Sequence, residues 1–111
     1  METIKFIKNK PQVHVGSRKY ISPEEMLHLE SDLNYTVIAL RDGQKILSST
    51  TLKKIEKRLI DFKNFVRVNK SAIVNLDYVE SHQENGFLLP NNKFLIFSRR
   101  QGKNWKEKQV A

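Results

Sequence analysis

The fold class is decided by residues 35–48, which read Tyr35-Thr36-Val37-Ile38-Ala39-Leu40-Arg41-Asp42-Gly43-Gln44-Lys45-Ile46-Leu47-Ser48. Aliphatic and β-branched residues dominate both ends of this stretch, as is typical of β-strands. Between them, Asp42-Gly43 supplies the positive φ angles that a tight hairpin turn requires. The stretch therefore predicts an antiparallel hairpin with strands over residues 35–40 and 45–48.

Short alternating runs on both sides of this hairpin predict further strands. Residues 3–8 alternate apolar and polar side chains, so Ile4 and Phe6 share one face. Asn85-Gly86 marks a second hairpin turn, and Ser22-Pro23 is typical of the start of one helical turn. The remaining strand signals lie at residues 13–15, 19–21, 26–29, 65–68, 72–74, 76–80, 87–89 and 94–97.

One segment predicts a true helix. Leu52, Ile55 and Leu59 recur at helical spacing, lysines and other charged residues fill the positions between them, and three candidate N-cap residues precede the segment. A helix of about ten residues is marginal alone, so its apolar stripe must pack on the sheet. The basic segment 98–106 fits a short helix or a loop. Together these signals predict one domain over residues 1–111, mainly β, with eight to ten short antiparallel strands and one short amphipathic helix.

Composition narrows the classes of function. The 111 residues carry 20 Lys and Arg against 12 Asp and Glu, and the formal net charge of +8 favours a polyanionic partner. The last 21 residues hold six Lys or Arg and one Glu, which fits either a nucleic-acid contact or a solubilising basic tail. No apolar run is long enough to cross a membrane, and the absence of cysteine suits a reducing compartment.

Catalytic and metal chemistry find little support. The sequence has no cysteine nucleophile and no motif of the hydrolase, zinc-protease, P-loop or dinucleotide-binding kind. His14, His28 and His82 stand far apart and lack metal-ligand spacing. We therefore expect no enzyme activity, no cofactor and no metal site.

Five stretches, in order, resemble the LytTR domain, whose members share an E-S-x-x-N-Y-T strand, a D-G hairpin, a Leu-rich helix, an F-x-R-x-H-x-S-x-I-V-N block and a closing S-R. The corresponding stretches here are residues 29–36, Asp42-Gly43, the helix from Leu52, residues 65–75 and residues 97–100. The resemblance is strongest over residues 5–105. It implies about ten strands in stacked antiparallel sheets with one helix.

The resemblance also implies a function. LytTR domains are bacterial, cytoplasmic regulators of transcription whose loops enter successive major grooves on one side of double-stranded DNA. They usually follow a receiver domain as the output domain of a response regulator. We expect this chain to act as a standalone regulator, because it begins with Met, or to be part of a longer one. Because one small module binds modestly, we expect two copies on repeated promoter sites, with a homodimer on DNA.

Carrying the family's contacts over position by position gives seven candidate DNA-binding residues. They are Asn34, Tyr35, Arg67, Asn69, Lys70, Arg99 and Arg100. Arginine can bind a guanine edge through two hydrogen bonds, asparagine can bind adenine in the same way, and lysine reaches phosphate or guanine. The family commonly has His where Asn69 stands and Arg or Asn where Lys70 stands, so its base preference does not transfer to this contact.

Other interpretations remain open for several of these residues. Asn34 fits a turn, Tyr35 a half-buried strand position and Arg67 a solvated sheet position, while Asn75 fits a backbone cap better than a DNA contact. Two rival functions also remain. One is a non-specific or single-strand nucleic-acid binder, and the other is a protein-interaction module that antagonises another regulator.

Overall fold

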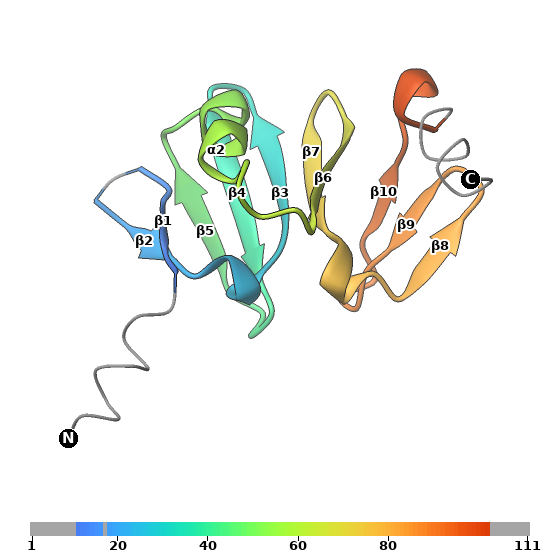
Figure 1. Ribbon diagram of the computed structural model, residues 1–111, viewed down its shortest axis with the longest axis horizontal. Coiled ribbons are helices and arrows are strands. Elements are labelled where there is room, and N and C mark those ends of the chain that lie inside the picture. Colours follow the sequence, from blue (N-terminus) through green and yellow to red (C-terminus); the bar gives the residue numbers. More distant parts are fainter. Residues whose placement is uncertain (1–10, 17, 103–111) are drawn as a thin grey trace.

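Short antiparallel strands make up most of the molecule, as the alternation of the sequence predicts (Figure 1). The computed structural model describes residues 11–16 and 18–102, and the strand predicted at residues 3–8 lies outside them. The elements are β1 (Val13–His14), β2 (Tyr20–Ile21), the 3₁₀ turn η1 (Pro23–Glu25), β3 (Met26–Asp32), β4 (Tyr35–Leu40), β5 (Lys45–Ser48), α2 (Leu52–Arg58), β6 (Phe65–Asn69), β7 (Ala72–Asn75), the 3₁₀ turn η2 (Leu76–Tyr78), β8 (Ser81–Gln83), β9 (Gly86–Leu88) and β10 (Phe94–Ile96).

The largest sheet has five strands in the order β5-β4-β3-β7-β6, and every neighbouring pair is antiparallel. β3 lies at its centre, with Leu29 opposite Ile38 of β4 and Ile73 of β7. Two smaller sheets complete the fold, one formed by β1 and β2 and the other by β8, β9 and β10. The described part of the chain thus contains ten strands in three antiparallel sheets, and the expected fold class is confirmed.

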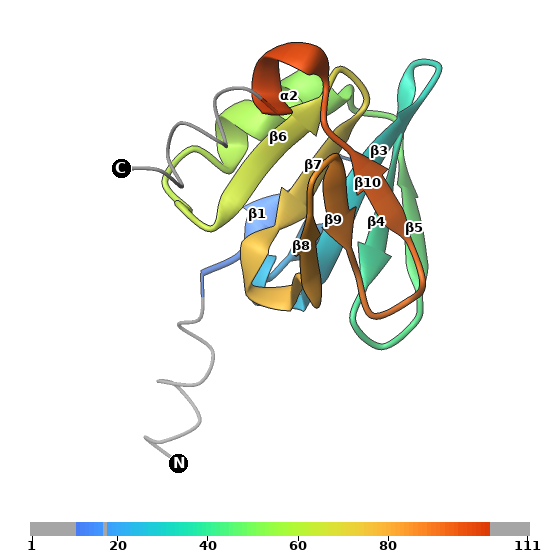
Figure 2. The ribbon, with the colours of Figure 1, turned by 90° about the vertical axis from the view of Figure 1, so that its right-hand side faces the viewer.

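The five-stranded sheet carries a separate hydrophobic core on each face. Neighbouring strand residues point to opposite faces, and β7 shows the consequence. Ile73 joins one core with Leu29 and Ile55, whereas Val74 joins the other with Phe87 of β9. Helix α2 and the β1–β2 sheet therefore cover one face, and the β8–β10 sheet covers the opposite face (Figure 2).

Helix α2 begins where the sequence predicts. The Thr51 side chain accepts a hydrogen bond from the Lys54 backbone N–H, which caps an otherwise unpaired donor of the first turn. Leu52 and Ile55 are buried within the helix, and Leu59 is buried directly after it. The helix is seven residues long, so packing of this apolar stripe on the sheet must stabilise it.

Three local predictions need correction. Residues 76–80 do not form a strand, because the Asn75 side chain accepts a hydrogen bond from the Asp77 N–H and starts the 3₁₀ turn η2. In the β4–β5 hairpin only Gly43 of the Asp-Gly pair has positive φ, at 94°, and the Gly43 N–H donates to Leu40 O. Ser22 precedes η1, but its side chain makes no capping hydrogen bond.

Candidate nucleic-acid interface

Three connections that are distant in sequence meet along one edge of the molecule. The register of the central sheet places the β3–β4 loop beside the β6–β7 turn, because the Ser31 N–H donates to Ser71 O at 2.8 Å. The Ser98 N–H donates to Val68 O, also at 2.8 Å, and so ties the end of β10 to the same turn. In both ribbon views these connections lie at the upper end of the molecule (Figures 1 and 2). We call this end the loop edge.

The β3–β4 loop contributes Leu33, Asn34 and Tyr35. Asp32 pairs with Tyr35, which leaves only Leu33 and Asn34 to connect the strands. Leu33 has a φ of 57° and a side chain that is 93% exposed. Positive φ is uncommon for residues other than glycine, so the tight turn imposes it here. Asn34 is exposed, and Tyr35 is 47% exposed, so both side chains are available to a partner.

The β6–β7 turn contributes Asn69 and Lys70. The Asn69 side chain donates from Nδ2 to Ile96 O at 2.6 Å and accepts from the Ser71 N–H at 2.7 Å. One side chain thus shapes the turn and fixes it to β10. The Lys70 side chain is exposed at the tip. The second Nδ2 hydrogen of Asn69 is the donor left over for a partner.

Arg67 lies beneath this turn and faces helix α2. Its Nε donates to Asn69 O at 2.9 Å and its Nη2 to Lys70 O at 2.7 Å, while Nη1 is paired with Glu56 of the helix. A guanidinium presents its donors in a fixed fork, which suits two neighbouring carbonyls. All three nitrogens of Arg67 therefore have partners within the protein.

The end of β10 leads into a helical segment over residues 99–102 (Figure 1). Ser98 caps it, since its Oγ accepts from the Gln101 N–H at 3.1 Å and its carbonyl accepts from the Gly102 N–H at 2.8 Å. Of the two possibilities for segment 98–106, the helix is therefore found for its described part. Arg99 and Arg100 are both exposed in the first turn.

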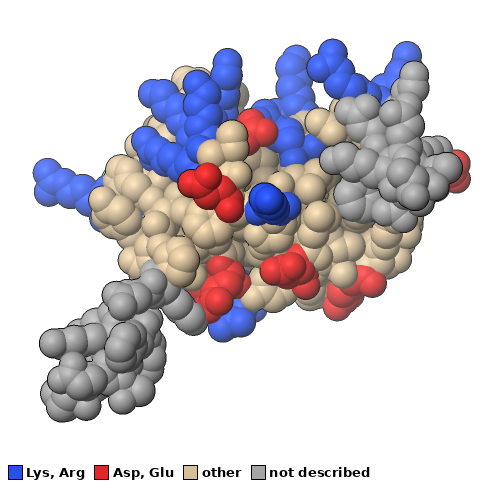
Figure 3. Space-filling model, in the orientation of Figure 1, with Lys and Arg blue, Asp and Glu red and all other residues tan. Residues whose placement is uncertain are grey.

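Charge is distributed unevenly over the molecule (Figure 3). Lys and Arg gather along the loop edge, above α2 and around residues 99–102, while several acidic side chains lie at the opposite edge. That edge holds the β4–β5 turn and the turns η1 and η2, where Arg41 is paired with Glu25 at 3.1 Å. A hydrogen bond to Tyr78 raises the pKa of Arg41. The loop edge is therefore the face suited to a polyanion.

One buried titratable group lies away from the loop edge. His28 of β3 is 3% exposed, and burial lowers its pKa, although neighbouring Glu30 acts in the opposite direction. Its Nε2 lies 3.1 Å from the Asn91 amide nitrogen, and its Nδ1 lies 3.3 Å from a carboxylate oxygen of Glu30. Lys93 is paired with Glu30 at 3.0 Å, and the positive charge of Lys93 further lowers the pKa of His28.

The structure thus brings six of the seven candidate residues to the loop edge and places Arg67 behind it. Sequence reasoning missed Glu56, because its partner Arg67 comes from another element. It also missed Leu33, whose exposure depends on the turn conformation. Asn75 is fully buried and donates to Met26 O at 2.9 Å, which confirms its expected backbone-bridging role. Among the described residues, no group of three or more His, Asp or Glu side chains could hold a metal ion.

Comparison with known proteins identifies this arrangement. The family model for the LytTr DNA-binding domain matches residues 16–109. The chain belongs to the LytTR family. Its domain type is a DNA-binding one, not a catalytic one. No curated protein matches the sequence significantly. Within residues 11–16 and 18–102, no helix is long and apolar enough to cross a membrane.

A solved structure agrees with the fold of this LytTR domain. It is described as the LytTr DNA-binding domain of a methyl-accepting/DNA response regulator from Bacillus cereus. The two share 14% sequence identity with a TM-score of 0.67, and the match covers 91% of this chain and 96% of the other. At this low identity the match shows a shared fold.

Proposed function

We propose that this LytTR domain binds double-stranded DNA sequence-specifically and regulates transcription, with its loop edge entering the major groove on one side of the duplex. The observation that carries the proposal is the convergence of three connections on one basic edge, joined by the Ser31–Ser71 and Ser98–Val68 hydrogen bonds. Because these two main-chain hydrogen bonds join them, the three connections form one continuous surface. Such a surface can present side chains to several bases at once.

The candidate residues fall into two groups, one for contact with DNA and one for positioning the β6–β7 turn. Asn34, Lys70, Arg99 and Arg100 have exposed side chains on this edge and supply contacts to bases and phosphates, with Tyr35 beside them. Arg67 and Asn69 spend most of their hydrogen-bonding capacity inside the protein. We assign to them the positioning of the β6–β7 turn, with the remaining Asn69 donor free for a base.

A single module of this size offers few contacts, so we propose that two copies bind repeated sites on a promoter and that a homodimer forms there. The proposed function places the protein in the cytoplasm and requires no cofactor and no catalytic residue. Lys and Arg would neutralise phosphates at the loop edge, and the opposite edge would face away from the duplex.

The test begins with selection of a consensus from random duplexes, followed by anisotropy titrations on the selected duplex and a scrambled one. Lys70→Ala and Arg100→Ala each remove one charge at the loop edge. Lys45→Ala removes the same charge at the opposite end of the sheet, where Lys45 pairs with Ala39. We expect Arg100→Ala to cost about 1–3 kcal/mol on the selected duplex, the value of a good base contact.

The control and the scrambled duplex separate the alternatives. Lys45→Ala should leave both affinities within about twofold, since its charge lies on the far edge. If no consensus emerges and all three variants weaken both duplexes equally, binding is non-specific. If none of the duplexes binds, the proposed function is wrong, and a protein partner is the alternative to test.

A further inference from the structure

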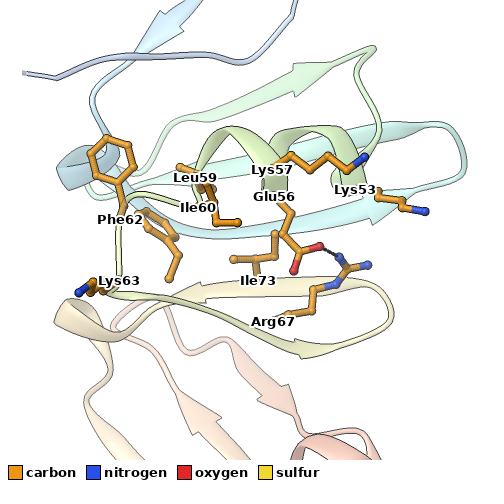
Figure 4. Close-up of a pocket in the computed structure, with 10 residues that line it drawn as sticks. Lys53, Glu56, Lys57, Leu59, Ile60, Phe62, Lys63, Arg67 and Ile73 are labelled. Carbon is orange, nitrogen blue, oxygen red and sulfur yellow. Dashed lines mark hydrogen bonds and ion pairs between the residues drawn. The ribbon is translucent and has the colours of Figure 1, made fainter.

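A hollow of about 320 Å³ lies between helix α2, the segment that follows it and strand β6 (Figure 4). Its floor is apolar and includes Leu59, Phe62, Phe65 and Ile73. Ile60 stands at the mouth with 77% of its surface exposed. Apolar surface left in water costs roughly 25 cal/mol per Å², so an apolar occupant would gain free energy by covering it.

Cations surround this apolar floor. Lys53 and Lys57 extend from α2 at one end of the hollow, and Lys63 stands at the other (Figure 4). The one carboxylate in the lining, Glu56, is already paired with Arg67. The three lysines therefore leave the hollow with a net positive rim, which complements an anionic group carried on an apolar body.

Size and charge together define the occupant. A cavity of about 150 Å³ accommodates benzene, so this hollow suits a body of roughly two fused rings. A second copy of the chain would bring its own net charge of +8 against the lysines. We propose that the hollow binds a small, apolar organic acid whose carboxylate lies beside Lys53 and Lys57, while Lys63 adds positive charge at the far end.

The occupant of this hollow would contact the residue that positions the β6–β7 turn. Arg67 lines the hollow, and the same guanidinium holds the carbonyls of Asn69 and Lys70. A bound carboxylate changes the electrostatic field at the Arg67–Glu56 pair. The hydrogen bonds of Arg67 transmit this change to the β6–β7 turn. Ligand binding itself is independent of DNA, and only its regulatory meaning rests on the proposed function.

The test is a titration of ¹⁵N-labelled protein with 2-naphthoate, without DNA, followed by amide chemical shifts. The matched probes are neutral 2-naphthamide and cationic 2-naphthylmethylammonium. We expect saturable shifts along residues 56–65 and at residues 69–71 with 2-naphthoate. The amide should bind about tenfold more weakly, because it lacks roughly 1.4 kcal/mol of charge attraction. The cation should bind more weakly still.

Two charge-matched variants locate the site. Lys57→Glu reverses a charge on the rim, and Lys45→Glu makes the same change on the exposed start of β5. Lys57→Glu should weaken 2-naphthoate about tenfold or more, whereas Lys45→Glu should leave it within about twofold. Ile60→Asp, at an exposed position, should weaken it as well. The spectra themselves show that each variant is folded.

Arg67→Lys tests the connection to the turn, since it should preserve the shifts of residues 56–65 and remove those of residues 69–71. The proposal is overturned if 2-naphthoate causes no saturable shifts, if the amide binds equally well, or if Lys45→Glu matches Lys57→Glu. It is also overturned if residues 69–71 never respond. Loss of DNA binding, measured separately, would count against the proposed function and not against this site.

Discussion

Replacement of Arg67 by lysine separates a positioning role from a phosphate contact. Both residues carry one positive charge, but lysine lacks the planar fork of donors. Arg67 holds two backbone carbonyls of the β6–β7 turn and pairs with Glu56. A single ammonium nitrogen cannot take the three separate positions that Nε, Nη1 and Nη2 of Arg67 hold. We therefore expect Arg67→Lys to loosen the turn while the net charge stays constant.

The magnitude follows from the lost contacts. If lysine keeps one of the three, two hydrogen bonds disappear, each worth about 0.5–1.5 kcal/mol net. The Arg67 side chain is 24% exposed, so water replaces part of the loss. We expect a decrease of about 1–3 kcal/mol in the free energy of unfolding. With a urea m-value near 2 kcal/mol/M, the midpoint should fall by about 0.5–1.5 M.

The assay combines urea unfolding with DNA titrations on the selected and scrambled duplexes. Affinity for the selected duplex should fall, while affinity for the scrambled duplex and the salt dependence stay unchanged, since the charge is retained. Arg18→Lys, at an exposed arginine, is the control. A stability change below about 0.5 kcal/mol, or an equal loss on both duplexes, would refute the positioning role.

Three further predictions concern the core, a buried histidine and the charge. Ile55→Ala should cost about 2–5 kcal/mol in unfolding free energy, because the fully buried side chain joins α2 to the sheet; unchanged melting would show that α2 does not pack as described. Because the pKa of His28 is lowered in the folded protein, the unfolded chain takes up this proton at a higher pH than the folded protein does. The contribution of His28 to the free energy of unfolding should therefore be fully present above pH 6.5 and should decrease as the pH falls below it. His28→Gln should remove this part of the pH dependence. Identical slopes of unfolding free energy against pH for the two proteins would contradict the role given to His28. Binding to DNA should weaken steeply with salt, with the logarithm of affinity falling by about 0.9 per phosphate contact, and a flat profile would exclude DNA as the main partner.

Local patterns predicted the elements whose signals lie within a few residues. The β4–β5 hairpin followed from alternation and one turn, and α2 followed from its apolar spacing and its N-cap. The strand predicted at residues 76–80 was wrong. These residues alternate as in a strand, but the Asn75 side chain favours a 3₁₀ turn. In such cases a hydrogen bond from one side chain outweighs the pattern of its neighbours.

The sequence and the resemblance predicted candidate residues, but not the contacts that each of them makes within the fold. The resemblance placed Arg67 and Asn69 among the DNA contacts. Their internal partners, Glu56 and Ile96 O, come from elements that are adjacent only in the folded chain. Likewise, the sequence shows Lys53 and Lys57 only as charged residues between the apolar positions of the helix, and the packing of α2 beside β6 makes them the rim of a hollow.

The position of β3 has a consequence for how the chain is made. In the finished sheet β3 is flanked on both sides, but one of its neighbours, β7, is paired with it across 44 positions of sequence, as Leu29 and Ile73 show. While the ribosome synthesises the protein, β3, β4 and β5 emerge before β7, and the side of β3 that will pair with β7 stays an open edge until residue 75 is free. Unpaired edges of this kind recruit other chains. During the interval before β7 docks, a nascent chain is therefore exposed to misassembly at this edge.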